Sequence, residues 1–369
     1  MQKIATKATG NNRYYILDAS RFFAAMAVVL FHFFFLSWSA EHVDSVSYKS
    51  IGEFFKYGYL GVQFFFLISG FVIFMSIQKG GVIEFIASRA SRLYPAYWFA
   101  VLLTSIFIIC IDKNTDELQA VDILVNLTML QKFFNIPNID GVYWTLAIEL
   151  IFYFWITVLL ATKSVGKFET FAFVFLLISS LSRFLHFPNS INLILLTEYS
   201  PYFIAGASFY LICQQGTSPI KISLIIASFF LSLHQAIFLQ LPTIQLKHSS
   251  IFSEMIVALI IAFFYLFFLV VCLKKHKTYR PKIYVFLGAL TYPLYLTHQQ
   301  IGYILMDSLS GAINKYILVL LVVIICLLIS SFIYLYIETP ISKNMRARIL
   351  NICSTISFKM GYPKKRQDA

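Results

Sequence analysis

Charged side chains are scarce in this 369-residue chain: only 12% of its residues are Asp, Glu, Lys or Arg, about half the share usual in soluble domains. In contrast, 59% of the residues are hydrophobic, including 39 Phe and 22 Tyr. So few charged groups could not shield that much apolar surface from water. The composition therefore excludes a disordered chain, a collagen-like chain and a soluble enzyme. It predicts an all-α, polytopic membrane protein.

Cysteine is also sparse, and its five residues are odd in number and dispersed mainly over apolar stretches. That pattern predicts neither a disulfide framework nor a zinc site, and we expect no metal ligands. Internal repeats of the kind found in many transporters are missing, as are polar stretches long enough for a second domain. We expect one membrane domain over residues 1–342 and a basic cytoplasmic tail over residues 343–369.

Apolar runs are abundant, and about ten of them could form spanning helices, each of which needs about 20 residues. They lie near residues 16–37, 59–78, 94–111, 143–162, 168–187, 191–213, 219–238, 251–273, 283–306 and 313–337. The first run is too long for a signal peptide and is expected to stay in the membrane. The sixth and seventh runs have the least definite limits.

The distribution of Lys and Arg predicts the orientation. With ten spans both termini share one side of the membrane, and most of the 29 basic residues fall on that side. Apart from the embedded Arg21, the exceptions are Lys49, Lys56, Lys113, Lys132, Arg183, Lys247 and Lys315. Basic loops are retained inside, so both termini are expected in the cytoplasm. The net charge of +12 then reflects topology and attraction to anionic lipid, and no nucleic-acid partner is expected.

Ionisable residues within the first apolar run are candidate site residues, because a charge in the membrane costs several kcal/mol unless it is paired or lines a cavity. Arg21 and His32 are eleven residues apart, within about 20° of three full helical turns and about 16 Å along the axis. They therefore share a helix face, with Asp18 placed to pair with Arg21. A neutral, buried His32 would suit a general base. Alternatively, Arg21 extends to the interface and His32 only bonds a neighbouring helix.

Later segments add further candidates. Glu149 has two open interpretations, an interhelical bond to Arg or Tyr and a role in positioning His32 or an acceptor. Arg89 and Arg92, at i and i+3, could clamp phosphates or merely anchor the cytoplasmic end of a helix. His298, one turn after Tyr295, is expected to be a packed, hydrogen-bonded histidine. Ser69 and Gly70 are expected to permit close helix packing, with no base beside Ser69 in the sequence.

Six short motifs occur in order along most of the chain: Leu17-Asp18-Ala19-Ser20-Arg21 with Phe31-His32, Gly61-Val62 through Ser69-Gly70-Phe71, Arg89-Ala90-Ser91-Arg92-Leu93-Tyr94-Pro95-Ala96-Tyr97, Trp144-Thr145-Leu146-Ala147-Ile148-Glu149, Tyr292-Pro293-Leu294-Tyr295-Leu296-Thr297-His298 and Glu338-Thr339-Pro340. Together they resemble the membrane-bound acyltransferase type 3 family, including its Arg-x10-His segment and its R-x-x-R loop. Any one of these motifs alone would be weak evidence.

The resemblance implies an O-acyltransferase of the bacterial cytoplasmic (inner) membrane. It implies transfer of an acyl group, usually acetyl from acetyl-CoA, to a hydroxyl of a surface polysaccharide, lipopolysaccharide, exopolysaccharide or lipid-linked sugar. His32 would be the general base, assisted by Arg21 and Glu149, and Arg89 and Arg92 would bind the nucleotide end of CoA. An acyl-His32 intermediate stays open. The rival interpretations are a glycan or lipid-carrier transporter, flippase or polymerase, and an accessory membrane protein without activity.

Overall fold

The computed structural model describes residues 14–39, 48–78, 80–111, 118–182, 184–273 and 282–359. Within these ranges every regular element is helical, as expected. The α-helices are α1 (Tyr15–Phe31), α2 (Ser37–Ser39), α3 (Lys49–Phe55), α4 (Gly61–Ile77), α5 (Val82–Ile111), α6 (Ala120–Asn126), α7 (Trp144–Ala161), α8 (Phe168–Leu181), α9 (Asn189–Ile194), α10 (Ser200–Gln215), α11 (Pro219–Gln235), α12 (Leu241–His248), α13 (Glu254–Leu273), α14 (Lys282–Thr297), α15 (Gln299–Ser308), α16 (Lys315–Phe332) and α17 (Thr339–Lys359).

Shorter helical turns connect several of these elements. The π-helical segments are η1 (His32–Leu36), η7 (Ala236–Gln240) and η8 (Ile333–Glu338). The 3-10 segments are η2 (Lys56–Leu60), η4 (Gln131–Phe134), η5 (Gly141–Tyr143) and η6 (Val165–Lys167). Because η1, η7 and η8 directly join neighbouring α-helices, they lengthen those helices and do not end them.

Seven helical stretches among the described residues are long and apolar enough to cross a membrane, which makes the chain a multi-pass membrane protein. They are Tyr15–Ser39, Lys49–Ile77, Val82–Ile111, Gly141–Ala161, Pro219–His248, Glu254–Leu273 and Lys315–Ile356. The other three expected spans coincide with shorter pieces. Helices α8 and α10 have 14 and 16 residues, and the run at 283–306 is divided into α14 and α15. The seventh run, whose limits were least definite, is in fact longer than expected.

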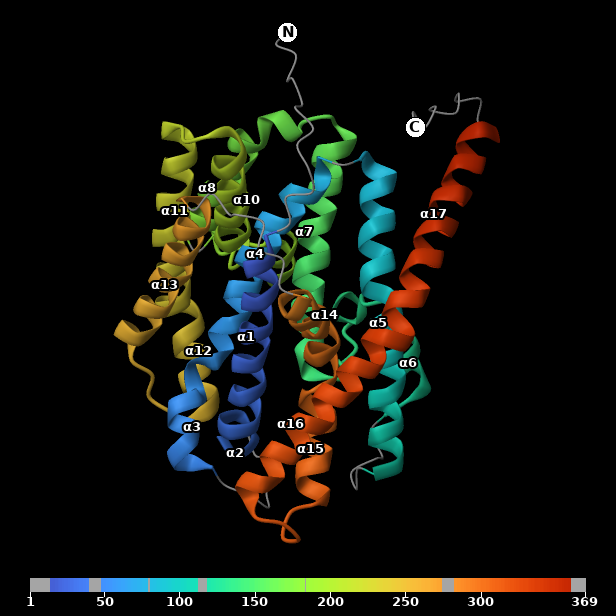
Figure 1. Ribbon diagram of the computed structural model, residues 1–369. Coiled ribbons are helices and arrows are strands. Elements are labelled where there is room, and N and C mark those ends of the chain that lie inside the picture. Colours follow the sequence, from blue (N-terminus) through green and yellow to red (C-terminus); the bar gives the residue numbers. More distant parts are fainter. Residues whose placement is uncertain are drawn as a thin grey trace.

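Helices α1 and α14 lie at the centre of the bundle and pack against each other (Figure 1). Helices α8, α11 and α13 lie on one side of this pair, and α5, α6 and α17 on the other. The start of α1 and the end of α17 lie at the same end of the bundle. Helix α17 packs along α5 and continues through residue 343, where we expected the tail to begin.

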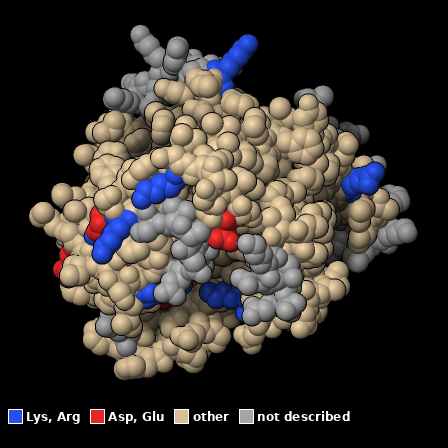
Figure 2. All heavy atoms as spheres, turned by 90° about the horizontal axis from the view of Figure 1, so that it is seen from below, with Lys and Arg blue, Asp and Glu red and all other residues tan. Residues whose placement is uncertain are grey.

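Charged side chains are sparse and scattered at the opposite end of the bundle (Figure 2). The basic residues that favoured the orientation are spread along the chain. Several of them lie in residues 1–13, 274–281 and 360–369, which are outside the described residues. Residues 40–47 and 112–117, which separate neighbouring apolar runs, also lie outside the described residues.

Glycines set the closest helix contact, between α4 and α10. A Cβ at Gly70 would overlap the backbone of Phe203, and one at Gly206 would overlap the backbone of Leu67. The expectation that Gly70 permits close helix packing is therefore confirmed. Such small-residue contacts let the backbones approach and gain van der Waals packing where the hydrophobic effect gives no help between helices.

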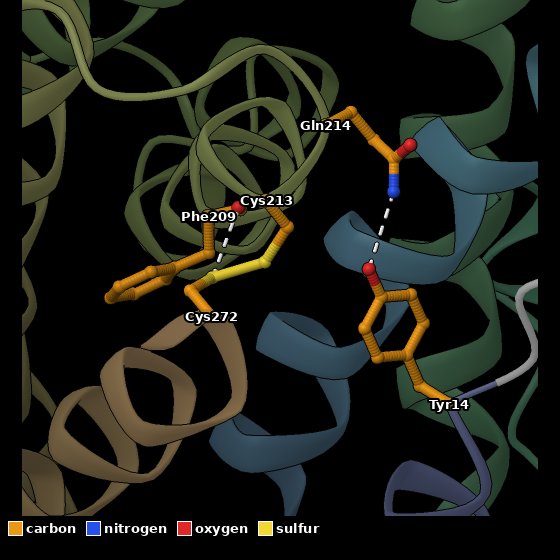
Figure 3. Close-up of a disulfide and its surroundings, with 5 residues drawn as sticks. All are labelled: Tyr14, Phe209, Cys213, Gln214 and Cys272. Carbon is orange, nitrogen blue, oxygen red and sulfur yellow. Dashed lines mark hydrogen bonds between the residues drawn. A yellow bond between two sulfur atoms is a disulfide. The ribbon is translucent and has the colours of Figure 1, made fainter. Parts of the chain in front are cut away.

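One cysteine pair departs from the expectation. Cys213, near the end of α10, and Cys272, near the end of α13, form a disulfide (Figure 3). The sequence could not indicate it, because the two residues are 59 positions apart and become neighbours only when α10 and α13 pack together. Beside the disulfide, Gln214 donates a hydrogen bond to the Tyr14 hydroxyl at the start of α1, over 3.2 Å (Figure 3).

The α4–α10 contact yields a stability prediction. Gly206→Ala should lower the free energy of unfolding by about 3 kcal/mol or more, because the added methyl group meets backbone atoms that cannot rotate away. Thermal melting in detergent, followed by size-exclusion chromatography, measures the loss. Gly166→Ala is the matched control, because nothing lies within 4 Å of a Cβ there. Equal melting of the two variants would contradict the packing argument.

Candidate functional site

A cavity of about 590 Å³ lies at the end of the bundle where α1 begins. Its walls come from α1, α4, α5, α14, η8 and α17, and they carry four arginines: Arg21, Arg89, Arg92 and Arg346. The acidic residues Asp18, Glu84 and Glu338 also line it. The volume falls in the usual range for small-molecule sites. Four guanidinium groups from three helices favour an anionic ligand with several acceptor oxygens.

Helix α5 brings Arg89 and Arg92 to this cavity together, as their spacing predicted. The guanidinium of Arg89 lies 5.9 Å from the ring centres of both Phe85 and Tyr153. It also donates to the Ser88 hydroxyl over 3.2 Å. These neighbours orient the side chain by cation–π contact and hydrogen bonding. Sequence reasoning missed Arg346, which reaches the same cavity because α17 packs against α5.

A second, much smaller cavity of about 60 Å³ shares two wall residues with the first, Arg21 and Tyr292. Its polar lining includes Ser69, Thr145, Glu149 and Tyr295. Arg21 thus lies where the basic cavity meets a narrow polar one inside the bundle. Asp18, expected beside Arg21, lines the basic cavity and packs closely against Gly288 of α14.

Glu149 is held by two hydroxyl groups in the smaller cavity. Its Oε1 accepts hydrogen bonds from Ser69 of α4, over 2.8 Å, and from Tyr153 one turn later in α7, over 2.5 Å. The bond to a tyrosine was one of its two expected interpretations. The contact with Ser69 was not foreseen, because these residues are 80 positions apart. A role for Glu149 in positioning His32 stays a prediction.

Tyr295 of α14 lines the smaller cavity. Its hydroxyl lies 2.9 Å from the Thr145 hydroxyl, and Thr145 donates in turn to the carbonyl oxygen of Val142 over 3.0 Å. The Thr145 proton is thereby engaged, so Tyr295 is the donor of the pair. The Tyr295 ring centre lies 5.8 Å from that of His298, which places the histidines directly beyond the cavity.

His32 and His298 form a buried pair. Nδ1 of His32 lies 2.9 Å from Nε2 of His298, and the ring centres are 4.9 Å apart. His32 is 8% exposed and His298 is 0% exposed. The expectation that His298 is packed and hydrogen-bonded is confirmed, but its partner lies 266 positions away in the sequence. Both residues occupy helix irregularities: His32 begins the π-helical segment η1, and His298 separates α14 from α15.

Helix α15 is pressed against the His32 segment just after His298. A Cβ at Gly302 would overlap the Phe33 ring, so the missing side chain allows the approach. The Tyr303 hydroxyl donates to the His32 carbonyl oxygen over 3.4 Å. These contacts fix the distance between the two histidine-bearing helices.

Asp140 is a residue that sequence reasoning missed. This fully buried carboxylate accepts from the backbone N–H of Val142, over 3.1 Å, and from that of Gln300, over 3.0 Å. It thereby ties the start of η5 and α7 to the first turn of α15, two residues after His298. Burial raises the pKa of Asp140 to about 7, and its two N–H donors act against that rise. The available signal was its position just before the tryptophan–threonine motif.

Removing this tie should damage both stability and the histidine pair. Asp140→Ala should cost about 2 to 4 kcal/mol, because two buried N–H groups lose their acceptor. Asp140→Asn, neutral and with one acceptor oxygen left, should lose less. Thermal inactivation in detergent gives the ranking. Glu254→Ala, at the exposed start of α13, should match the unsubstituted protein; if Asp140→Ala matched it too, the tie would carry no weight.

Comparisons with known proteins identify a family and two relatives. A family model described as an acyltransferase domain matches residues 14–336. The chain is 22% identical over 301 residues to the putative acetyltransferase ORF330 of Acidianus two-tailed virus, covering 80% of this chain and 83% of that protein. It is also 43% identical over 54 residues to the exopolysaccharide production protein ExoZ of Rhizobium meliloti (strain 1021).

The match to ExoZ spans 14% of this chain and 17% of that protein, so it is local. No solved structure matches the chain. The family model, in contrast, begins at the first described residue and runs almost to the end of η8, so it includes Arg21, His32, Arg89, Arg92, Glu149 and His298. The chain therefore belongs to the acyltransferase type 3 family.

Proposed function

We propose that this protein transfers an acyl group, in the simplest case acetyl, from cytoplasmic acyl-CoA to a hydroxyl group of a cell-surface or lipid-linked glycan. The observation that carries the proposal is the junction at Arg21. This residue lines both the four-arginine cavity and the narrow polar cavity, and it shares helix α1 and its η1 extension with His32. The family membership and the name of the viral relative support this reaction class, and the name of ExoZ supports a polysaccharide acceptor.

The proposed donor site is the basic cavity. The phosphates of CoA would contact Arg89 and Arg92 of α5 and Arg346 of α17, which all line this cavity. Arg21 would stand at the inner end, where the pantetheine arm turns into the polar cavity. Bidentate guanidinium contacts suit phosphate oxygens, and the number of arginines matches a ligand with several phosphates. No metal is part of the proposal.

The proposed orientation places this cavity on the cytoplasmic side, where acyl-CoA is available. The shorter helices α8 and α10 and the α14–α15 pair would then complete ten crossings, with both termini in the cytoplasm. The location that we propose is the bacterial inner membrane, which the family resemblance implies. His32 lies about 16 Å from Arg21 along the axis, toward the outer side, where a glycan acceptor would arrive.

The proposed chemistry is direct transfer. His32 removes the proton from the acceptor hydroxyl, and the oxygen attacks the thioester carbonyl carbon. The tetrahedral intermediate then collapses with cleavage of the carbon–sulfur bond, and the proton held by His32 passes to the departing thiolate. Glu149, with Ser69 and Tyr153, would hold the polar cavity open for the thioester. The catalytic contribution of a general base is typically 10²- to 10⁴-fold.

The decisive experiment measures transfer of labelled acetyl from acetyl-CoA to the glycan fraction of membrane vesicles. His32→Ala should reduce transfer at least about 100-fold while leaving the protein inserted and folded. Glycan movement without label transfer would favour the transporter, flippase or polymerase interpretation. Near-normal transfer by His32→Ala would remove His32 as the base. Intact-mass measurement with donor alone tests for an acyl-His32 intermediate.

Donor binding has its own test. The double variant Arg89→Ala with Arg92→Ala should raise the KM for acetyl-CoA at least about tenfold with a smaller effect on kcat, because a phosphate clamp supplies ground-state binding. Arg348→Ala is the matched control, since Arg348 is an exposed residue of α17 and is not part of the cavity wall. An unchanged KM in the double variant would leave these arginines with a role in membrane orientation alone.

A further inference from the structure

We propose that His298 is a positioning residue that fixes which nitrogen of His32 carries the proton, and so prepares Nε2 of His32 as the basic atom. This inference deepens the proposed function and rests on it in one respect, that His32 is the base. The geometry of the pair by itself carries the assignment of the protons.

The assignment starts from atoms that can only accept. Nδ1 of His298 lies 3.1 Å from the carbonyl oxygen of Leu294 and 3.0 Å from that of Tyr295. A carbonyl oxygen has no proton to donate, so Nδ1 of His298 must be the donor. In the neutral ring, Nε2 of His298 is then an acceptor.

The second step passes this constraint to His32. Its Nδ1 lies 2.9 Å from Nε2 of His298, so it must donate the proton in that hydrogen bond. A neutral His32 with its proton on Nδ1 has its lone pair on Nε2. The chain of bonds from two backbone carbonyls through His298 therefore selects one tautomer of His32.

A doubly protonated His298 would reverse the outcome, because its Nε2–H would require an acceptor on His32. The surroundings oppose that state. His298 has no exposed surface, and a buried imidazolium without a facing carboxylate is strongly disfavoured. Among the described residues, its ring contacts are with His32, Phe33 and Tyr295, and its Nδ1 hydrogen bonds are with the two carbonyl groups. None of these is an anion.

The fold holds this arrangement in place before any substrate binds. Gly302 lets α15 approach Phe33, Tyr303 bonds the His32 carbonyl group, and Asp140 anchors the Gln300 N–H. His298 thus occupies the role that an orienting carboxylate has in acid–histidine pairs, but without adding a charge to the membrane interior.

The direct test is the tautomer itself. In full-length protein with ¹⁵N-labelled histidine, the His32 resonances are assigned by their loss in His32→Gln. The expected spectrum shows protonated Nδ1 and unprotonated Nε2 for His32 at neutral pH. A protonated Nε2 with bare Nδ1 in the otherwise unchanged protein overturns the inference, whatever the variants do.

Activity variants give a second, independent test. His298→Leu removes the acceptor, and we expect kcat to fall at least about 100-fold with the KM for acetyl-CoA within about threefold. His298→Gln can present an amide oxygen to His32. Its kcat should therefore be at least about tenfold higher than that of His298→Leu, and His32 should keep the same tautomer. Thr297→Val, an adjacent buried change that removes only the hydroxyl bond to the Pro293 carbonyl group within α14, should stay near the original activity.

The outcomes separate the two proposals. Full activity in His298→Leu, with His32→Ala inactive, would reject the positioning role and leave the proposed function standing. Activity in His32→Ala would reject the general base, and the tautomer measurement would still decide whether His298 sets the proton on His32. Equal loss in His298→Gln and His298→Leu, with an unchanged tautomer in both, would reduce His298 to packing.

Discussion

The cost of placing polar groups inside an apolar bundle is the constraint on which this structure depends. Every buried donor or acceptor needs a partner, because the membrane interior offers no water. In the centre of the bundle these partners come from neighbouring helices. Ser69 is hydrogen-bonded to Glu149, Thr145 to Tyr295, and His298 to His32. Each of these bonds joins different helices. The hydrogen bonds of the polar site therefore also fix how the central helices are positioned against one another.

Small residues make the rest of that arrangement possible. Gly70 and Gly206 bring α4 against α10, and Gly302 brings α15 against Phe33. At each contact the glycine has no side chain, so backbones or rings can touch. The resulting van der Waals packing is a principal source of attraction between helices in lipid. The chemistry and the packing are linked, since Ser69 stands next to Gly70 and His298 stands one turn before Gly302.

The site combines two environments along one helix. At the start of α1, Arg21 faces a large cavity with three further arginines. Beyond the end of α1, His32 lies in a buried pair with His298. This division suits a reaction in which a polyanionic donor must be held while a neutral base acts on an acceptor.

The sequence by itself determined much of this protein. Its apolar runs determined an all-helical membrane protein, because a helix of about 20 apolar residues is long enough to cross a bilayer. The i, i+3 spacing brought Arg89 and Arg92 to one cavity. The eleven-residue spacing predicts that Arg21 and His32 share a helix face. These features depend on local geometry, which a helix imposes whatever surrounds it.

The tertiary structure alone decided the remaining features. The pairing of His32 with His298, the tie from Asp140 to α15, the arrival of Arg346 and the Cys213–Cys272 disulfide all join residues far apart in the chain. The break at His298 was also missed, although Thr297-His298-Gln299-Gln300 form a short polar interruption of the apolar run. Hydropathy records how much apolar surface a segment has, but not which helix covers it. Partners across helices are set by packing, and packing is a property of the whole bundle.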